Sequence, residues 1–451
     1  MYSDSLKTQD LKSIHKDTVL VGKKILSIRT LFIGIHKNKR KTSCIEYVDL
    51  GKQFYMKFRI LTVLISLSSL SLFAQDIELI KKHSFSVSEL SDTQFRDFIQ
   101  PRIQESQFVF LGEQHGIVEV GEATRILYTL GQPFGYDVLC IETDATAAKT
   151  ITSFFDAKNP LATAKKLDAT YDFSIPFYNN EEDIKMFQNV LDADGVLWGI
   201  DQSLMTQFRL NFEYLINNTK SAEFKSALQP LLEKAIAAFE KTVREKDFMA
   251  PYIFSYDDET HQKLLGYAST SEEKETLKAL KKTKEIYGYN FSGQYYLNNE
   301  VRARHMKQNF MRYYKAAQQK ETIPKVFFKL GGNHAARGLT RTRVYDIANL
   351  GAELAIMNGM ESLHLLVMGV SGTQNIANPF EPEKSKQTID TKDTLPKEFI
   401  DEALAGVHKY QIIDTKALRS KAHTFSKEVQ KMIFAYDVVI LLKDAKPLTS
   451  Y

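Results

Sequence analysis

The sequence contains few cysteines, and this limits the ways in which the fold can be held together. Of its 451 residues, two are cysteine and one is tryptophan. Cys44 lies in a basic N-terminal segment that we expect to be absent from the mature protein, so Cys140 would stand alone. A lone cysteine excludes an intramolecular disulfide, although it does not exclude export.

Several common catalytic motifs are also absent. The sequence has no Gly-x-Ser-x-Gly nucleophile elbow, because Gly369-Val-Ser-Gly-Thr373 has the wrong spacing. It contains no His-Glu-x-x-His, no Gly-x-Gly-x-x-Gly and no phosphate-binding Walker loop. These absences disfavour a serine esterase, a zincin and a nucleotide-binding protein.

The longest apolar run is too short to span a membrane comfortably. Residues 60–73 follow the basic Met56-Lys-Phe-Arg59 and precede Ala74-Gln75, which is the order of a secretory signal peptide. Signal peptides lie at a true N-terminus, so we expect residues 1–55 to be an upstream extension, 56–75 the signal and 76–451 the mature protein. An uncleaved anchor is the alternative. The prediction is a periplasmic or secreted protein with no stable membrane span after signal cleavage.

The positive charge of the chain is concentrated at its N-terminal end. The net charge is +4, yet residues 1–55 hold 11 Lys or Arg against 5 Asp or Glu. Residues 56–75 add two basic residues and no acid, which leaves about −4 for residues 76–451. The sequence therefore offers no basic patch that argues for nucleic acid as a partner. Its oligomeric state is not predicted.

Apolar strands alternate with amphipathic helices along residues 105–200, and the same pattern returns after residue 299. This alternation is typical of βαβ units, so we predict an α/β fold with a mainly parallel central sheet flanked by helices. Gly372–Pro396, which is rich in Asn, Pro, Thr and Lys, is predicted to be an irregular loop. The predicted strands are Phe108–Glu113, Val138–Glu142, Val196–Asp201, Lys325–Leu330, Ala352–Met357, His364–Val370, Tyr410–Ile413 and Val438–Leu442, and the predicted helices are Glu119–Leu130, Ala145–Phe155, Glu181–Leu191, Asn299–Lys320 and Ala335–Leu350.

A different pattern occupies residues 206–290. Long charged segments such as Ala222–Lys246 and Glu272–Tyr287 carry apolar residues at helical spacing. We therefore predict a helical insertion or lid within the single α/β domain of residues 76–451.

Polar residues stand at the ends of four predicted strands. Phe108-Val-Phe-Leu-Gly-Glu-Gln-His-Gly116 delivers Glu113 and His115 into a turn bounded by glycines. The other three strands end at Glu142, at Asp201, and at Asn333 followed by His334. Ligands of parallel sheets bind beyond the carboxyl ends of the strands, so these side chains are expected to face one cleft.

Two imidazoles and up to three carboxylates in one cleft suit two kinds of chemistry. A carboxylate can fix the tautomer of an imidazole, which then removes a proton from water or a substrate hydroxyl. The same groups can instead bind a metal ion, with His115, His334, Glu113 and Glu142 as the candidate ligands.

Each candidate also has a purely structural interpretation. A histidine at a strand end is often a hydrogen-bonding residue, and Glu142 or Asp201 could cap the helix that follows it. Arg302 and Arg304 lie on the predicted helix after Asn299, and Glu300 is spaced to form a surface ion pair with Arg304. The sequence leaves open which arginine faces the cleft.

The order of these motifs resembles that of the erythromycin esterase family and its wider relatives, which include haem-uptake-type and Tiki-like proteins. Gly112-Glu-Gln-His-Gly116 is similar to the family's Gly-Glu-x-x-His-Gly, with one residue fewer between Glu and His, as in the more distant relatives. The acid that ends the family's second strand resembles Glu142, and its Gly-x-Asp element resembles Gly199-Ile-Asp201. Arg302–Met306 resembles its Arg-x-x-x-Met helix, and Asn333-His334 a compressed Asn-x-His element.

This resemblance implies a hydrolase that acts on an ester or lactone of a small-molecule substrate without a cofactor, and the signal peptide predicts that the enzyme is exported. It implies that His115 is the general base for water, that Glu113 and Glu142 orient the base or the water, and that His334 assists. Arg302 or Arg304 would complete the catalytic set, and Asp201 and Asn333 would contact the substrate. The alternatives are a divalent-metal-dependent hydrolase or an iron- or haem-binding protein that uses the same His/Glu cluster, and an envelope protein whose cleft has lost its activity.

Overall fold

The computed structural model describes residues 77–175, 177–376, 378 and 381–451. These residues belong to one compact unit, Ala74–Tyr451. The predicted upstream extension and signal peptide lie outside the described residues. Within the described part of the chain, no helix is both long and apolar enough to cross a membrane.

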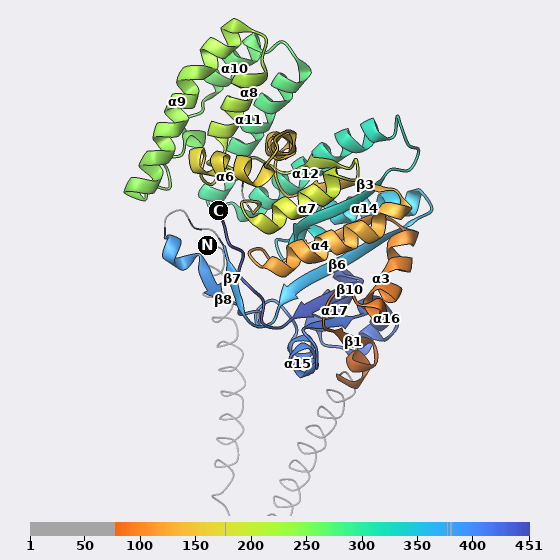
Figure 1. Ribbon diagram of the computed structural model, residues 1–451. Helices are drawn as coiled ribbons and strands as arrows, with labels where there is room; N and C mark the ends of the chain where they lie inside the picture. The colour runs from red at the N-terminus through yellow and green to blue at the C-terminus, as the bar shows by residue number, and fades with distance from the viewer. Residues whose placement is uncertain (1–76, 176, 377, 379–380) are drawn as a thin grey trace, which may run out of the picture. The chain divides into compact units, whose positions relative to one another are not determined.

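Eight strands form the central sheet, in the order β1-β9-β10-β6-β2-β5-β3-β4 (Figure 1). The pairs between β10 and β4 in this order are all parallel, while β9 runs antiparallel to both of its neighbours. The predicted mainly parallel sheet is therefore confirmed. The strands are β1 (Ser84–Val87), β2 (Ser106–Glu113), β3 (Tyr136–Ile141), β4 (Val196–Gly199), β5 (Lys325–Gly331), β6 (Glu361–Gly369), β9 (Tyr410–Ile413) and β10 (Val438–Leu442).

Both faces of the sheet are covered by helices, so its central strands are apolar on both sides. All eight residues of β2 are buried; Val109 and Leu111 point into one core, and Phe108 and Phe110 into the other. This burial explains why β2 is continuously apolar rather than alternating. The first core is packed by α3 (Thr93–Glu105), α4 (Val118–Gly131), α5 (Ala145–Ser153) and α7 (Glu181–Leu191), and the second by α12 (Tyr295–Ala317), α14 (Ile347–Met357), α15 (Lys397–Ala405), α16 (Thr415–Leu418) and α17 (Lys427–Ala435).

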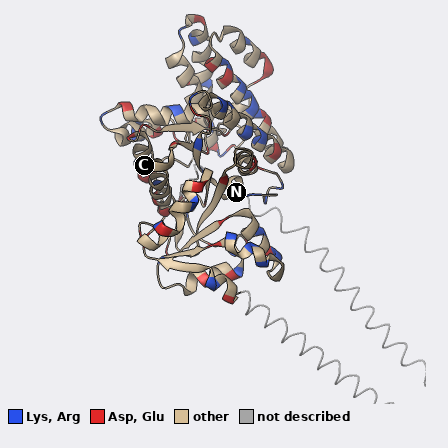
Figure 2. Cartoon of the chain, turned by 90° about the vertical axis from the view of Figure 1, so that its right-hand side faces the viewer, with Lys and Arg blue, Asp and Glu red and all other residues tan. Residues whose placement is uncertain are grey.

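Four further helices lie where the sequence predicts a helical insertion. They pack on α5 and α12, and Figure 2 shows basic and acidic residues interspersed along them at the top of the view. Their apolar residues join the first core, as Phe212, Leu228 and Leu277 do. They are α8 (Phe208–Asn218), α9 (Ala222–Glu245), α10 (Asp258–Tyr267) and α11 (Ser271–Phe291), and α6 (Pro160–Thr170) lies before them in the chain.

The prediction for residues 335–357 was wrong. The helix expected at Ala335–Leu350 is a single turn, α13 (Gly332–Ala335), followed by an irregular segment, and the strand expected at Ala352–Met357 is the second half of α14. The backbone of Arg343 has a left-handed φ of 62°, which interrupts a helix. Asp346 then caps α14 by accepting a hydrogen bond from the backbone N–H of Ile347.

Smaller differences concern the chain segments at the edge of the sheet. The sequence analysis missed β1 and α3, and the loop predicted at Gly372–Pro396 contains a two-stranded ribbon. This ribbon, β7 (Thr373–Asn375) and β8 (Lys386–Thr388), is tied to the turn after β2, since the backbone N–H of Asn375 donates to the carbonyl of Gly116.

The end of β4 offers a test of how tightly the sheet packs on α5. A Cβ at Gly199 would overlap the backbone carbonyl of Asp144 and contact the side chain of Ala148, so Gly199→Ala is expected to lower the free energy of unfolding by about 1–3 kcal/mol. Gly266→Ala in α10, where a Cβ meets no atom within 4 Å, is the control and is expected to stabilise by about 0.5–1 kcal/mol. Urea denaturation measures both; equal effects would show that the contact at Gly199 is unimportant.

Candidate active site

The polar residues at the strand ends meet at one edge of the sheet. Strands β2, β5, β3 and β4 are neighbours in that order and are parallel, so their carboxyl ends lie side by side. Glu113 ends β2, Glu142 follows β3, and Asp201 follows β4 by two residues. The sheet order therefore brings together residues that are far apart in the sequence.

One half of the site is built around Glu113. Its Oε1 lies 2.6 Å from Nδ1 of His115, and its Oε2 lies 2.6 Å from Nζ of Lys329. Lys329 is buried on β5, where its ammonium group also lies 3.9 Å from Asp183 and 4.6 Å from the centre of the Tyr178 ring. Glu113 thus joins a buried cation to a histidine whose side chain is 25% exposed.

These charges determine which ring nitrogen of His115 carries the proton. Burial alone would raise the pKa of Glu113, but Lys329 and the hydrogen bond from His115 outweigh it and lower that pKa to about 2. Burial would likewise lower the pKa of Lys329, whereas the charges of Glu113 and Asp183 raise it. An ionised Glu113 can only accept a hydrogen bond, so Nδ1 of His115 carries the proton and a neutral ring leaves Nε2 free to accept one.

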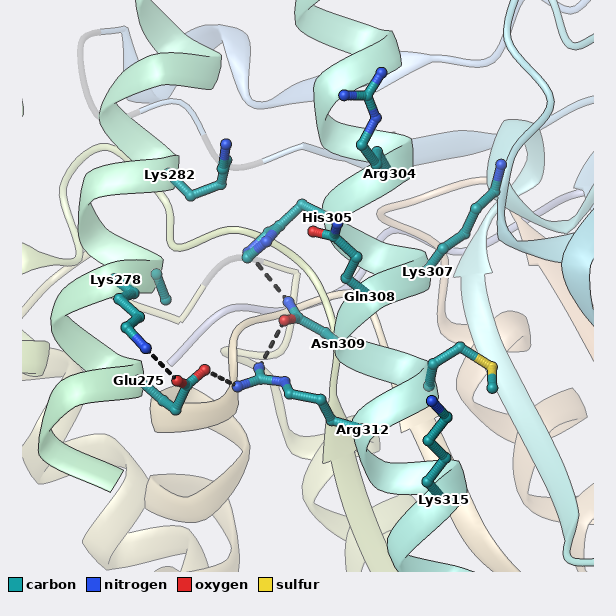
Figure 3. A pocket seen from close by; sticks show the side chains of 12 residues that line it. Glu275, Lys278, Lys282, Arg304, His305, Lys307, Gln308, Asn309, Arg312 and Lys315 are labelled. Atoms are coloured by element: carbon teal, nitrogen blue, oxygen red, sulfur yellow. Dashed lines mark hydrogen bonds and ion pairs between the residues drawn. The ribbon is translucent and has the colours of Figure 1, made fainter. Parts of the chain in front are cut away.

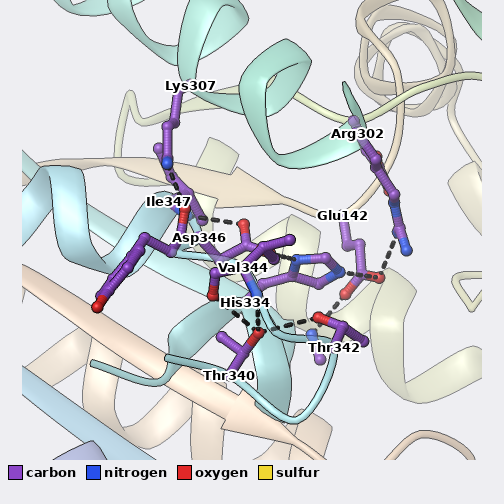
Figure 4. Close-up of polar contacts among 12 residues, drawn as sticks. Glu142, Arg302, Lys307, His334, Thr340, Thr342, Val344, Asp346 and Ile347 are labelled. Carbon is purple, nitrogen blue, oxygen red and sulfur yellow. Dashed lines mark hydrogen bonds and ion pairs between the residues drawn. The ribbon is translucent and has the colours of Figure 1, made fainter. Parts of the chain in front are cut away.

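The other half of the site is built around Glu142. Arg302, from α12, donates to Oε1 of Glu142 at 2.9 Å and forms two hydrogen bonds with the carboxylate of Asp201. Nε2 of His334 lies 3.4 Å from Oε1 of Glu142, and its Nδ1 lies 2.9 Å from Asp346 (Figure 4). Arg302 and His334 therefore lie among three carboxylates, those of Glu142, Asp201 and Asp346.

The charges in this half hold His334 in its protonated form. Burial would lower the pKa of His334, but the negative charges of Asp346 and Glu142 outweigh burial and raise it to about 10. Burial would raise the pKa of Glu142, but the charge and hydrogen bond of His334, together with the charge of Arg302, hold it well below its usual range. At neutral pH the site thus contains an imidazolium at His334 and a carboxylate at Glu142.

The two halves meet at Gly331, the last residue of β5. Its backbone N–H donates to Oε2 of Glu142, and a Cβ at this position would lie 3.1 Å from both that oxygen and Nε2 of His115. The proton-accepting nitrogen of His115 and the carboxylate of Glu142 therefore border the same small space. Glycine at position 331 keeps that space open.

Phe177 covers the exposed face of the His115 ring. The two rings are stacked, with centroids 4.0 Å apart and planes 10° apart, and Phe177 has a left-handed φ of 67°. The cavity beside His115 has a volume of only about 10 Å³. This conformation has room for no more than about one water molecule beside His115, so a larger ligand requires Phe177 to move.

The structure places the predicted site residues in two groups. Glu113, His115, Glu142, Asp201, His334 and Arg302 lie together. Neither Glu142 nor Asp201 is the N-cap of a helix, because Asp144 caps α5 and α8 begins only at Phe208.

Arg304 and Asn333 do not join this group. Arg304 is exposed and pairs with Glu300, so the inclusion of Arg304 in the catalytic set is corrected and Arg302 is the arginine at the site. Asn333 is exposed and forms no hydrogen bond with the residues that the structure describes.

The sequence analysis missed Lys329, Asp183, Asp346 and Phe177. For Lys329 a signal was present, because a lysine inside Val326-Phe-Phe-Lys-Leu330 cannot avoid burial if that strand is central, and buried lysines are almost always paired. Asp183 and Asp346 carry no such signal, since their contacts arise only in the tertiary structure.

Most atoms of the cluster that could coordinate a metal ion already form ion pairs or hydrogen bonds with other protein groups. Among the described residues, no set of three or more His, Cys, Asp or Glu side chains is arranged to hold a metal ion. Glu113 is paired with Lys329, and both ring nitrogens of His334 face carboxylates. Coordination by the four candidate ligands would require these pairs to separate.

Comparison with known proteins identifies the fold. No protein-family model and no curated protein matches the chain. A mutant of the erythromycin esterase EreC in its open conformation matches 79% of this chain and 95% of its own, with a TM-score of 0.53 and 12% identity. A Bacillus cereus protein matches 84% of this chain and 99% of its own, with a TM-score of 0.50 and 16% identity. The chain thus has the erythromycin esterase-like fold, as the motif order predicted.

The buried ion pair at Lys329 is tested by its removal. Lys329→Met keeps the volume of the side chain but leaves Glu113 buried without its cation, and the free energy of unfolding is expected to fall by about 3–5 kcal/mol. Lys325→Met on the same strand is the control, because Lys325 is only partly buried and donates to the carbonyl of Gln104. Equal denaturation midpoints for the two variants would contradict the role given to Lys329.

The protonated state of His334 predicts a pH dependence of stability. The pKa of His334 is raised to about 10 from 6.5, so its contribution is fully present below pH 6.5 and is lost as the pH rises towards 10. Thermal unfolding is expected to show a Tm that falls over this range in the wild type and falls less in His334→Gln. Parallel pH profiles for the two proteins would show that His334 is not protonated at neutral pH.

Proposed function

We propose that the protein is a hydrolase that cleaves an ester or lactone by direct attack of a water molecule. The observation that carries this proposal is the Glu113–His115 pair, in which an ionised carboxylate holds Nδ1 and leaves Nε2 as a proton acceptor beside Glu142. A histidine oriented in this way is suited to general-base catalysis. The erythromycin esterase-like fold of the chain supports the same reaction class, although fold alone does not define a reaction.

In the proposed reaction, water approaches the space between His115 and Glu142. His115 removes a proton through Nε2 while the water oxygen forms a bond to the acyl carbon, and the carbonyl oxygen becomes an oxyanion. When the tetrahedral intermediate collapses, the bond to the leaving oxygen breaks and that oxygen receives the proton from His115. The products are a carboxylic acid and an alcohol, or a hydroxy acid from a lactone.

The cations of the site would stabilise the negative charge of the intermediate. The Nε2–H group of His334 faces Oε1 of Glu142 over a long contact of 3.4 Å, which it would exchange for a hydrogen bond to the oxyanion, whereas Nδ1 is held by Asp346 at 2.9 Å. Arg302 fixes Glu142 and Asp201 through its hydrogen bonds, and its side chain is 22% exposed. We assign Asp201 and Asp346 positioning roles, because they act through Arg302 and His334.

The proposal assigns no catalytic role to a metal or haem. It is supported by the ion pair with Lys329, which occupies Glu113, and by the protonation of His334, which removes a lone pair that a metal would need. The identity of the substrate and export by way of residues 56–75 stay predictions, and the latter depends on residues outside those that the structure describes.

The role of His115 is tested with a panel of esters and lactones of different size. General-base assistance contributes on the order of 10² to 10⁴ in rate, so His115→Ala is expected to lower kcat/KM by that factor. The control is His423→Ala, since His423 is exposed and lies outside the site. Unchanged turnover in His115→Ala would refute the assignment.

The metal and haem alternatives are tested on the same protein. Plasma mass spectrometry and absorption spectra are recorded for protein that begins at Asp76, beside a His115→Ala/His334→Ala double variant. We expect hydrolysis to survive treatment with a chelator. A stoichiometric metal or haem that is lost in the double variant, together with loss of hydrolysis after chelation, would favour metal-dependent chemistry or iron handling instead.

A further inference from the structure

A larger cavity lies between α11 and α12, separate from the candidate active site. Its volume is about 580 Å³, and Figure 3 shows side chains of both helices around it. None of the residues that line it belongs to the Glu113 or Glu142 cluster. The active-site cavity, at about 10 Å³, is much smaller. Of the two cavities, only the α11–α12 cavity has room for an organic molecule in this conformation.

The lining of the α11–α12 cavity is strongly basic. Six of its lining side chains are Lys or Arg, and Glu275 is the only acidic one among the described residues that line it. Four of these cations are paired: Lys278 and Arg312 with Glu275, Lys282 with Glu285, and Arg304 with Glu300. Lys307 donates to the backbone carbonyl of Tyr345, and neither Lys307 nor Lys315 forms an ion pair with a described residue, so the lining keeps a net positive charge. The cationic residues are Lys278, Lys282, Arg304, Lys307, Arg312 and Lys315.

His305 lies buried at the cavity, and its hydrogen bonds determine its tautomer. The amide of Asn309 is fixed because its Nδ2 donates to the carbonyl of Ile200 at 2.7 Å and its Oδ1 accepts from Arg312 at 2.7 Å. The second proton of Nδ2 is then directed to Nε2 of His305, 3.1 Å away. Nε2 must accept, so a neutral His305 carries its proton on Nδ1.

Nδ1 of His305 is therefore a donor that has no acceptor among the described residues. The side chain belongs to a residue that is only 7% exposed, and burial lowers its pKa to about 4, so the ring is neutral at physiological pH. The Nδ1–H group is not among the fully buried polar atoms that lack a partner in the described residues, so water reaches it at the cavity, and an acceptor bound there could replace that water. Figure 3 shows the ring between Lys282 and Asn309, facing the space between the two helices.

We propose that the α11–α12 cavity binds a phosphate group, either as free phosphate or as part of a small phosphorylated molecule. Lysines supply positive charge, Arg312 adds a guanidinium that already donates to Glu275 and Asn309, and His305 supplies a neutral donor at the base. The cavity is larger than inorganic phosphate, and Ala279 and Met311 give it an apolar wall on which an organic group could pack. The cavity binds and does not catalyse, because Nε2 of His305 is already occupied by Asn309.

The binding is measured by isothermal titration calorimetry with inorganic phosphate and with glucose 6-phosphate, and sodium chloride at equal ionic strength corrects for screening. Lys307→Gln/Lys315→Gln removes the two lysines that form no ion pair, and His305→Phe removes the donor. Each is expected to weaken binding about tenfold or more. Lys274→Gln is the matched control, because Lys274 is exposed on α11 and does not line the cavity.

The outcomes separate the two sources of phosphate. Equal affinity for the two probes indicates free phosphate, and tighter binding of glucose 6-phosphate indicates a phosphorylated molecule. The proposal is overturned if neither probe binds, if chloride reproduces the heat, or if the double variant binds as tightly as Lys274→Gln. Thermal unfolding without ligand shows that each variant is folded, so a loss of binding can be assigned to the cavity.

Discussion

The candidate active site depends on one interaction, the buried ion pair between Lys329 and Glu113. A carboxylate without a partner would be protonated at this depth, because burial favours its neutral form. Protonated Glu113 could donate to His115, and Nδ1 of the ring would then no longer have to carry the proton. Lys329 prevents this by keeping Glu113 ionised, which leaves Nε2 of His115 as the acceptor. A lysine that lines the cavity beside His115 thus determines which atom can act as the base.

The order of the parallel strands is the second constraint on the site. Three neighbouring strands, β2, β5 and β3, bring Glu113, Gly331 and Glu142 to the same edge of the sheet. The central strand of the three, β5, therefore lies between the two carboxylates. Lys329 lies two residues before Gly331 on this same strand and faces the same side of the sheet. Strand β5 therefore provides the cation, the open space and, through its N–H, a hydrogen bond to Glu142.

The sequence predicts the strands and their polar ends well because both are local signals. An apolar run followed by a polar turn needs no knowledge of the rest of the fold. Prediction from the sequence fails at residues 335–357, because the apolar and small residues there fit either a helix or a strand. Only the cap at Asp346 decides that this segment forms a helix. The sequence also does not show whether Arg302 or Arg304 faces the site. These residues point about 200° apart around α12, and only the position of the helix against the sheet shows which one reaches Glu142.

Helix α12 connects the active site with the α11–α12 cavity. Arg302 points to Asp201, while His305, one turn later, faces the cavity, and Asn309 bonds both to His305 and to the carbonyl of Ile200. Ile200 precedes Asp201, which positions Arg302. The side-chain amide of Asn309 therefore contacts both this segment and His305 at the base of the cavity. A phosphate that accepts from Nδ1 of His305 would make Nε2 a better acceptor for Asn309 and strengthen this connection. The cavity is therefore placed where its occupant would support the same helix that holds Glu142 and Asp201 in position.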